Sequence, residues 1–173
     1  MADQLTVTWA DENIGNGIDV PTTTKAPVTF SFSKGSNNNT PKYYNTGNGI
    51  RLYGGNTMTI SVAEGYELTS VVLNTSTGQY AINSETTVTN GTITIDGGTT
   101  TLTANANVSS MTMTEGGTSG HARIQSIVVN YTAVAGDKEL AGLQFNHHIA
   151  TEVQVIEQQV DVEVIAAHIE MIL

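Results

Sequence analysis

Short runs in which apolar and polar residues alternate recur along residues 28–132 and predict β-strands. The clearest runs are residues 28–32, where Val, Phe and Phe alternate with polar residues, and residues 58–62, where Met, Ile and Val do so. Glycine- and asparagine-rich turn signals separate such runs at intervals of about ten residues. We therefore expect a mainly β protein, with residues 28–132 forming an antiparallel β-sandwich or a jelly roll.

Two turn signals in this region are especially clear. Asn90-Gly91 separates the apolar-alternating residues 87–89 and 92–95, and this dipeptide predicts a tight β-hairpin between them. Gly97-Gly98 then predicts the next turn, before a strand over residues 99–103.

The first 27 residues differ from the central region. Leu5, Val7 and Trp9 alternate with threonines, which predicts a short strand. An Asn/Gly-rich break follows, and residues 19–27 contain two prolines and a threonine run, which favours an extended linker. We interpret residues 1–27 as a strand arm and linker that dock on something other than the main core.

The last part of the chain differs again. Residues 133–142 have the composition of a linker, and residues 143–173 contain no Gly, Pro, Lys or Arg. Their apolar residues recur at spacings of three and four, which predicts a helix with one continuous apolar stripe. An alternative is a pair of strands, because the valines also alternate. The stripe consists of Phe145, Ile149, Val153, Ile156, Val160, Val164, Ala167 and Met171. We expect this stripe to assemble with other protein subunits, in a homo-oligomer or on a particle protein.

Charge and composition exclude several classes of function. The net charge is −10 with only six Lys and Arg, so the basic surface of a nucleic-acid-binding protein is missing. The chain has no cysteine, which removes disulfides and thiolate chemistry. It also has no apolar run long enough to insert in a membrane, and its first residues do not resemble a signal peptide.

Few residues are arranged for catalysis or metal binding. Asp11, Asn13 and Gly15 resemble part of a calcium loop, but no bidentate glutamate follows at the required spacing. No nucleophile elbow or phosphate-binding loop occurs. We therefore expect neither a metal, nor a cofactor, nor an enzymatic activity.

The best binding candidates are aromatic. Tyr43, Tyr44 and Tyr53 lie near Arg51, and sugar or peptide sites commonly combine aromatic faces with a few polar donors. The structural alternative is that these tyrosines close the end of the sandwich, with their hydroxyls bonded to the backbone.

Longer motifs in the central region resemble a known module. Residues 30–35 read Phe-Ser-Phe-Ser-Lys-Gly, residues 50–55 read Ile-Arg-Leu-Tyr-Gly-Gly, and residues 117–124 read Gly-Thr-Ser-Gly-His-Ala-Arg-Ile. Residues 28–132 thereby resemble a β-sandwich module repeated in exported surface proteins of gut Bacteroidota. The resemblance implies a fold without catalytic residues. Its matching polar and aromatic positions are Arg51, Tyr53, His121 and Arg123.

These patterns lead to three functional hypotheses. The first is a phage virion component, a capsid decoration or head-fibre protein that displays the sandwich on the virion surface. The second is an extracellular adhesion or carbohydrate-binding module of a bacterial surface protein, with surface glycans as partners. The third is a filament subunit whose N-terminal strand completes the sheet of a neighbour.

Overall fold

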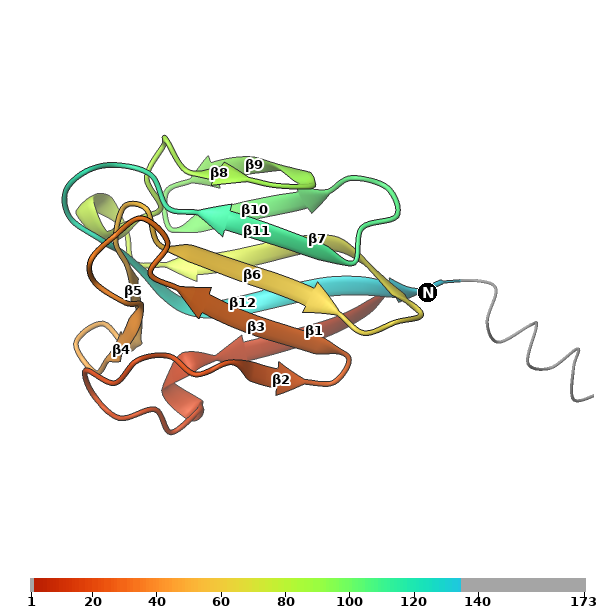
Figure 1. Ribbon diagram of the computed structural model, residues 1–173, viewed down its shortest axis with the longest axis horizontal. Helices are drawn as coiled ribbons and strands as arrows, with labels where there is room; N and C mark the ends of the chain where they lie inside the picture. The colour runs from red at the N-terminus through yellow and green to blue at the C-terminus, as the bar shows by residue number, and fades with distance from the viewer. Residues whose placement is uncertain (1, 135–173) are drawn as a thin grey trace, which may run out of the picture. The chain divides into compact units, whose positions relative to one another are not determined.

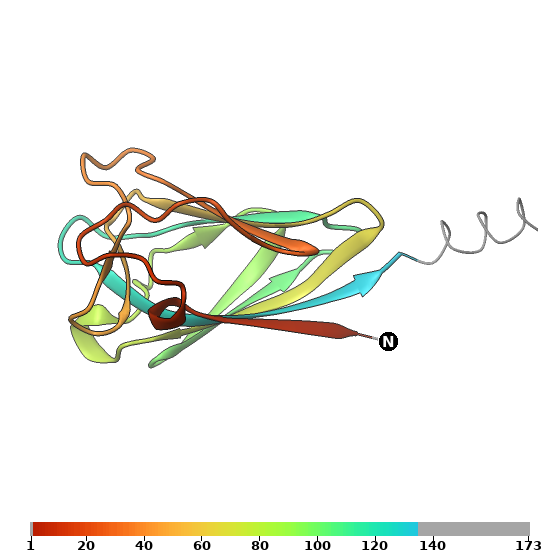
Figure 2. The same ribbon diagram turned by 90° about the horizontal axis from the view of Figure 1, so that it is seen from below.

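The computed structural model describes residues 2–134, which form two antiparallel β-sheets packed face to face (Figures 1 and 2). One sheet has seven strands and the other has five. The prediction of a mainly β, sandwich-like architecture is therefore confirmed.

The seven-stranded sheet has the order β4-β5-β12-β7-β10-β9, and β1 also pairs with β12. All of these pairings are antiparallel. Its strands are β1 (Asp3–Thr8), β4 (Lys42–Tyr44), β5 (Gly49–Leu52), β7 (Tyr66–Thr75), β9 (Gly91–Asp96), β10 (Thr99–Ala104) and β12 (Ala122–Ala133).

The five-stranded sheet has the order β2-β3-β6-β11-β8. Two short 3₁₀ helices, η1 (Trp9–Asp11) and η2 (Gly78–Tyr80), lie in the connections. The strands of this sheet are β2 (Thr23–Lys25), β3 (Val28–Ser33), β6 (Thr57–Val62), β8 (Thr87–Val88) and β11 (Ser110–Thr114).

The core lies between the sheets and is built from the inward-facing positions of the alternating strands. Successive side chains of a strand point to opposite faces, so one apolar set per strand is enough to fill the layer. The largest side chains that are fully buried are Trp9, Phe30, Ile50, Leu52, Met58, Ile60, Leu73, Leu102, Met111, Met113, Ile124 and Ile127.

Strand β12 runs the length of the sandwich and changes phase once near its start. Ala122 and Ile124 face the core before the change, and Ile127 and Val129 face it afterwards. The register against β7 shifts between Ile124 and Ser126, as a β-bulge requires. The bulge lets one strand present its apolar residues inward at even positions first and at odd positions later.

The prediction that the first strand docks away from the main core is wrong. Strand β1 pairs with β12 over its whole length, from Asp3 opposite Tyr131 to Thr8 opposite Ser126. Val7 is buried, and Trp9 is fully buried in the common core. The burial of these large apolar side chains explains why the segment belongs to the sandwich. Residues 23–25, expected in a linker, form β2 and pair with β3.

The predicted hairpin at Asn90-Gly91 is also wrong. Strand β8 pairs with β11 in one sheet, whereas β9 pairs with β10 in the other, so the dipeptide connects the two sheets. Asn90 adopts φ 60°, and a Cβ on Gly91 would lie 2.5 Å from the Thr103 carbonyl oxygen. The dipeptide does turn the chain, but the turn is a corner between sheets. The predicted turn at Gly97-Gly98 does join β9 to β10.

The predicted apolar-striped helix of residues 143–173 and most of the preceding linker lie outside the described residues. Within residues 2–134, no helix is long and apolar enough to cross a membrane.

Candidate ligand-binding site

A row of three cationic residues crosses one end of the seven-stranded sheet. Lys42 of β4 lies opposite Arg51 of β5, and Arg51 lies opposite Arg123 of β12. The residues that flank Arg51 and Arg123 along their strands are buried in the core, so the cationic side chains point to the outer face. This end of the sheet is the end away from the N-terminus (Figure 1).

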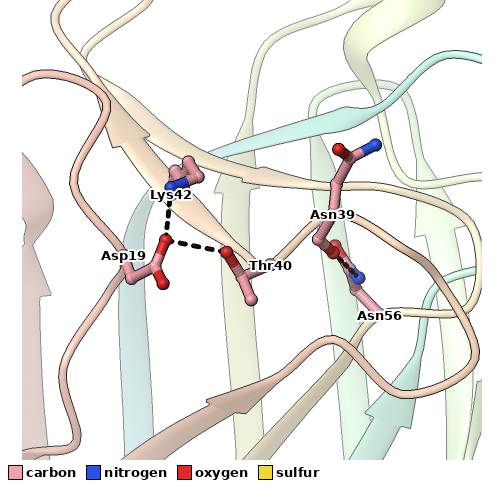
Figure 3. Close-up of polar contacts among 5 residues, drawn as sticks. All are labelled: Asp19, Asn39, Thr40, Lys42 and Asn56. Carbon is pink, nitrogen blue, oxygen red and sulfur yellow. Dashed lines mark hydrogen bonds and ion pairs between the residues drawn. The ribbon is translucent and has the colours of Figure 1, made fainter.

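Lys42 is the one member of the row with an acidic partner among the described residues. Its ammonium forms an ion pair with Asp19, which also accepts a hydrogen bond of 2.7 Å from the Thr40 hydroxyl (Figure 3). The hydrogen bonds from Lys42 and Thr40 lower the pKa of Asp19, and the bond to Asp19 raises the pKa of Lys42. Both groups therefore stay charged near neutral pH, and the charge of Lys42 is compensated.

The two arginines are instead stacked on tyrosine rings. The guanidinium carbon of Arg51 lies 3.7 Å from the centre of the Tyr44 ring, and that of Arg123 lies 3.5 Å from the centre of the Tyr80 ring. Cation–π stacking of this kind holds a guanidinium in a fixed plane without consuming its hydrogen-bond donors. Within residues 2–134, neither arginine has a carboxylate partner.

His121 joins the second arginine to a third tyrosine. Its Nε2 accepts a hydrogen bond of 3.1 Å from Nε of Arg123, and its ring packs against Tyr53 and Tyr80, with ring centroids 5.4 and 5.2 Å away. Burial lowers the pKa of His121, and the positive charges of Arg51 and Arg123 lower it further. The imidazole is therefore neutral at physiological pH and acts as an acceptor toward Arg123.

A small polar pocket lies next to this group and shares His121 with it. Its volume is about 30 Å³, which is enough for a hydroxyl group or one or two waters but not for a whole sugar ring. It is lined by Gly54, Gln79, Ala81, Asn83, Glu115, Gly116, Ser119, Gly120 and His121.

Glu115 is the acidic group of the pocket and is only 3% exposed. Its two carboxyl oxygens accept hydrogen bonds of 3.1 Å, one from the Asn83 backbone N–H and one from the Thr86 hydroxyl. Burial raises the pKa of Glu115 to about 7, and these two hydrogen bonds offset only part of that effect. The carboxyl group is therefore partly protonated near neutral pH.

Asn56 fixes the loops that frame the site. It is fully buried, and its side-chain oxygen accepts a hydrogen bond of 2.9 Å from the Tyr53 N–H. Its amide donates bonds of 2.9 and 2.8 Å to the carbonyls of Lys34 and Asn39, the second of which is drawn in Figure 3. One side chain thus ties the loop after β5 to the loop between β3 and β4.

Close backbone packing explains the glycines beside the site. A Cβ on Gly54 would lie 1.9 Å from the carbonyl oxygen of Gly117, which real structures do not allow. The backbone N–H of Gly55 donates to the Glu115 carbonyl at 2.8 Å. These contacts hold the loop after β5 against the β11–β12 connection that carries His121.

The structure brings together five of the six residues that the sequence suggested for binding. Tyr44, Arg51, Tyr53, His121 and Arg123 share the cationic and aromatic end of the sheet. These five residues and Tyr80 form a group that we call the Arg–Tyr cluster.

Tyr43 does not belong to this cluster. It is only 5% exposed and packs in the core, because it precedes Tyr44 on the same strand and points to the opposite face. For Tyr43, burial in the core favours the structural alternative over a binding role. Sequence reasoning missed Tyr80, which lies in a short 3₁₀ helix, and Glu115, which has the sequence context of a turn.

The part of the chain that the structure describes contains no group of three or more His, Asp or Glu residues that could hold a metal ion. In the segment that resembles a calcium loop, Asp11 lies in η1 and Asp19 is engaged with Lys42. The predicted assembly residues between 143 and 173 lie outside the described residues.

Comparisons with known proteins leave the site to be interpreted from its geometry. No protein-family model matches the chain, and no curated protein is significantly similar to it.

Proposed function

We propose that residues 2–134 form a non-enzymatic binding module that recognises carbohydrate through the Arg–Tyr cluster. The observation that carries this proposal is the concentration of three half-buried tyrosines, a neutral histidine and two arginines at one end of one sheet. Aromatic faces bind the apolar faces of sugar rings, and polar donors at their edges bind the hydroxyl groups.

The adjoining pocket supports the same interpretation. Its lining offers amide, hydroxyl and carboxyl groups from Gln79, Asn83, Ser119 and Glu115, which suit a hydroxyl group that projects from a bound ring. Glu115 is the single carboxyl group that lines it. Most glycoside hydrolases use two carboxyl groups about 5 to 10 Å apart, so the pocket favours recognition over hydrolysis.

A glycan array followed by calorimetry tests this function. We expect the intact chain to bind a subset of bacterial-surface or mucin glycans, and Tyr44→Ala and Tyr80→Ala each to weaken that binding at least tenfold. Tyr66→Ala is the matched control, because Tyr66 forms an edge-to-face pair with Tyr131 near the far end of β12. Absence of binding to any glycan, or equal losses in all three variants, would contradict the proposal.

The setting in which the module acts is a separate proposal. The apolar stripe of residues 143–173 favours attachment to other subunits, as in a capsid decoration or head-fibre protein of a phage. The described fold fits such an arrangement, because β12 ends at Ala133, at the opposite end of the sandwich from the Arg–Tyr cluster (Figure 1). Removal of the residues after Gly136 tests the attachment.

A further inference from the structure

The two arginines of the Arg–Tyr cluster are unusual in this chain. They are the only arginines among its 173 residues, and they lie directly opposite each other on neighbouring antiparallel strands. Directly opposed residues have Cβ atoms about 5 Å apart, and like charges at such positions destabilise a sheet. The arrangement therefore destabilises the protein without a ligand, unless other groups compensate the repulsion between the two charges.

Within residues 2–134, few groups compensate the repulsion between these two positive charges. The chain carries 16 Asp and Glu, yet both ion pairs described there involve lysines. The carboxylate of Asp19 is bound to Lys42, at the other end of the cationic row. The Nε of Arg51 is buried without a hydrogen-bond partner in this part of the chain, and the hydrogen bond described for Arg123 goes to a neutral histidine.

The arginines are nevertheless held in place. Tyr44 and Tyr80 each cover one guanidinium plane, at 3.7 and 3.5 Å, and the aliphatic part of Arg123 passes over Gly47, where an added Cβ would lie 3.1 Å from Cδ. A guanidinium held in this way keeps its terminal N–H donors in a fixed fork. Such a fork matches the paired oxygens of a carboxylate or a sulfate.

We infer that Arg51 and Arg123 together bind the oxyanion group of an acidic sugar, either a sugar carboxylate or a sugar sulfate ester. The inference rests on the proposed carbohydrate-binding function and specifies the ligand class. The anion lies across the two guanidiniums and relieves their mutual repulsion. The ring packs beside the tyrosines, and a hydroxyl group reaches the polar pocket that shares His121 with the cluster.

Matched sugar pairs that differ only in the anion test the inference on the intact chain. We would compare galacturonate oligomers with galactose oligomers, and 6-sulfo-N-acetylglucosamine with N-acetylglucosamine. At least one acidic member should bind more than tenfold more tightly than its neutral counterpart. That preference should shrink as the salt concentration rises, because part of it is electrostatic. The pair that responds distinguishes carboxylate from sulfate.

Arg51→Gln and Arg123→Gln should each remove most of the preference for the acidic member. Arg51→Lys should keep only part of it, because an ammonium retains the charge and loses the fork. Lys25→Gln is the control, since Lys25 lies on β2 of the other sheet, paired with Glu12.

Three results would overturn the inference. Equal binding of acidic and neutral sugars that does not depend on the arginines would leave the carbohydrate-binding function standing and remove the anion site. Binding of acidic peptides, such as oligoglutamate, in place of sugars would assign the arginine pair to another partner. Absence of all sugar binding would overturn both the proposed function and the inference.

Discussion

The indole ring of Trp9 meets the ring of Phe30 edge to face, with centroids 5.7 Å apart and planes inclined at 82°. Trp9 follows β1 of the seven-stranded sheet, and Phe30 belongs to β3 of the five-stranded sheet. A second edge-to-face contact joins Trp9 to Phe32 at 5.4 Å. The N-terminal segment therefore bridges the two layers.

Replacing Trp9 by Ala should strongly destabilise the sandwich. The substitution leaves a cavity where a fully buried indole contacted two phenylalanine rings, and losses of about 3–5 kcal/mol are typical of such changes. Equilibrium unfolding in urea measures the effect. Thr6→Ala, at an exposed position of β1, should change stability by no more than about 0.5 kcal/mol. Similar values for the two variants would show that Trp9 is dispensable for the core.

Asn56→Ala should cost about 2–4 kcal/mol of folding free energy. The substitution leaves the Tyr53 N–H and the carbonyls of Lys34 and Asn39 without their buried partner. Because those groups frame the Arg–Tyr cluster, the variant should also weaken sugar binding under conditions where it is still folded. Asn105→Ala, at an exposed asparagine without a described side-chain hydrogen bond, is the control for denaturant unfolding. A loss of folding free energy below about 1 kcal/mol would mean that water molecules bond these three backbone groups in place of the Asn56 side chain.

Glu115 should make stability depend on pH between about 4.5 and 7. Burial raises its pKa from 4.5 to about 7, so in this range the folded protein binds more protons at this site than the unfolded chain does. The contribution of Glu115 to stability is therefore complete below pH 4.5 and falls as the pH rises toward 7. At pH 8 the ionised side chain should cost about 3 kcal/mol relative to a neutral one.

Glu115→Gln isolates this effect from the other ionisable groups. The variant should match the unsubstituted protein near pH 4.5 and exceed its stability at pH 8 by up to about 3 kcal/mol. Urea unfolding at a series of pH values gives the difference directly. Parallel stability curves for the two proteins would show that Glu115 ionises in the folded state as readily as in water.

Truncation after Gly136 should yield a folded monomer that no longer associates. Residues 2–134 contain both sheets and the whole described core, so the loss should affect assembly without unfolding the sandwich. Sedimentation velocity of the intact and truncated chains measures the change.

Substitutions in the intact chain provide the matched control for that prediction. Ile149→Glu with Ile156→Glu places charge on the predicted stripe and should reproduce the loss of association. Gln154→Glu with Gln158→Glu adds the same charge away from the stripe and should leave it intact. Association that survives both the truncation and the stripe substitutions would contradict the assembly hypothesis.

The alternation of residue types is sufficient to predict most strands. In β6, Met58 and Ile60 are fully buried while Thr57 and Thr59 lie on the other face, as a period of two requires. Sequence reasoning fails where long-range pairing decides the outcome. Asn90 and Gly91 form a turn in either case, and only the partners of β8 and β9 determine whether that turn closes a hairpin or connects two sheets.

Only part of the candidate site could be predicted, because it too depends on long-range strand pairing. Tyr44 and Arg51 are close along the chain, whereas Arg123 meets Arg51 only through the pairing of β5 with β12. Alternation could have separated Tyr43 from Tyr44, since neighbouring residues of a strand face opposite sides. Tyr80 has no such signal, because η2 is a short 3₁₀ helix without a periodic pattern.

The length of β12 has a mechanical consequence. Arg123 lies near its beginning and Ala133 at its end, a span of about 33 Å at roughly 3.3 Å per residue. A tether that pulls on the chain beyond Ala133 loads this strand along its axis, in shear against the ladders to β1 and β7. Many backbone hydrogen bonds then share the load at once, so the domain resists being unzipped one hydrogen bond at a time.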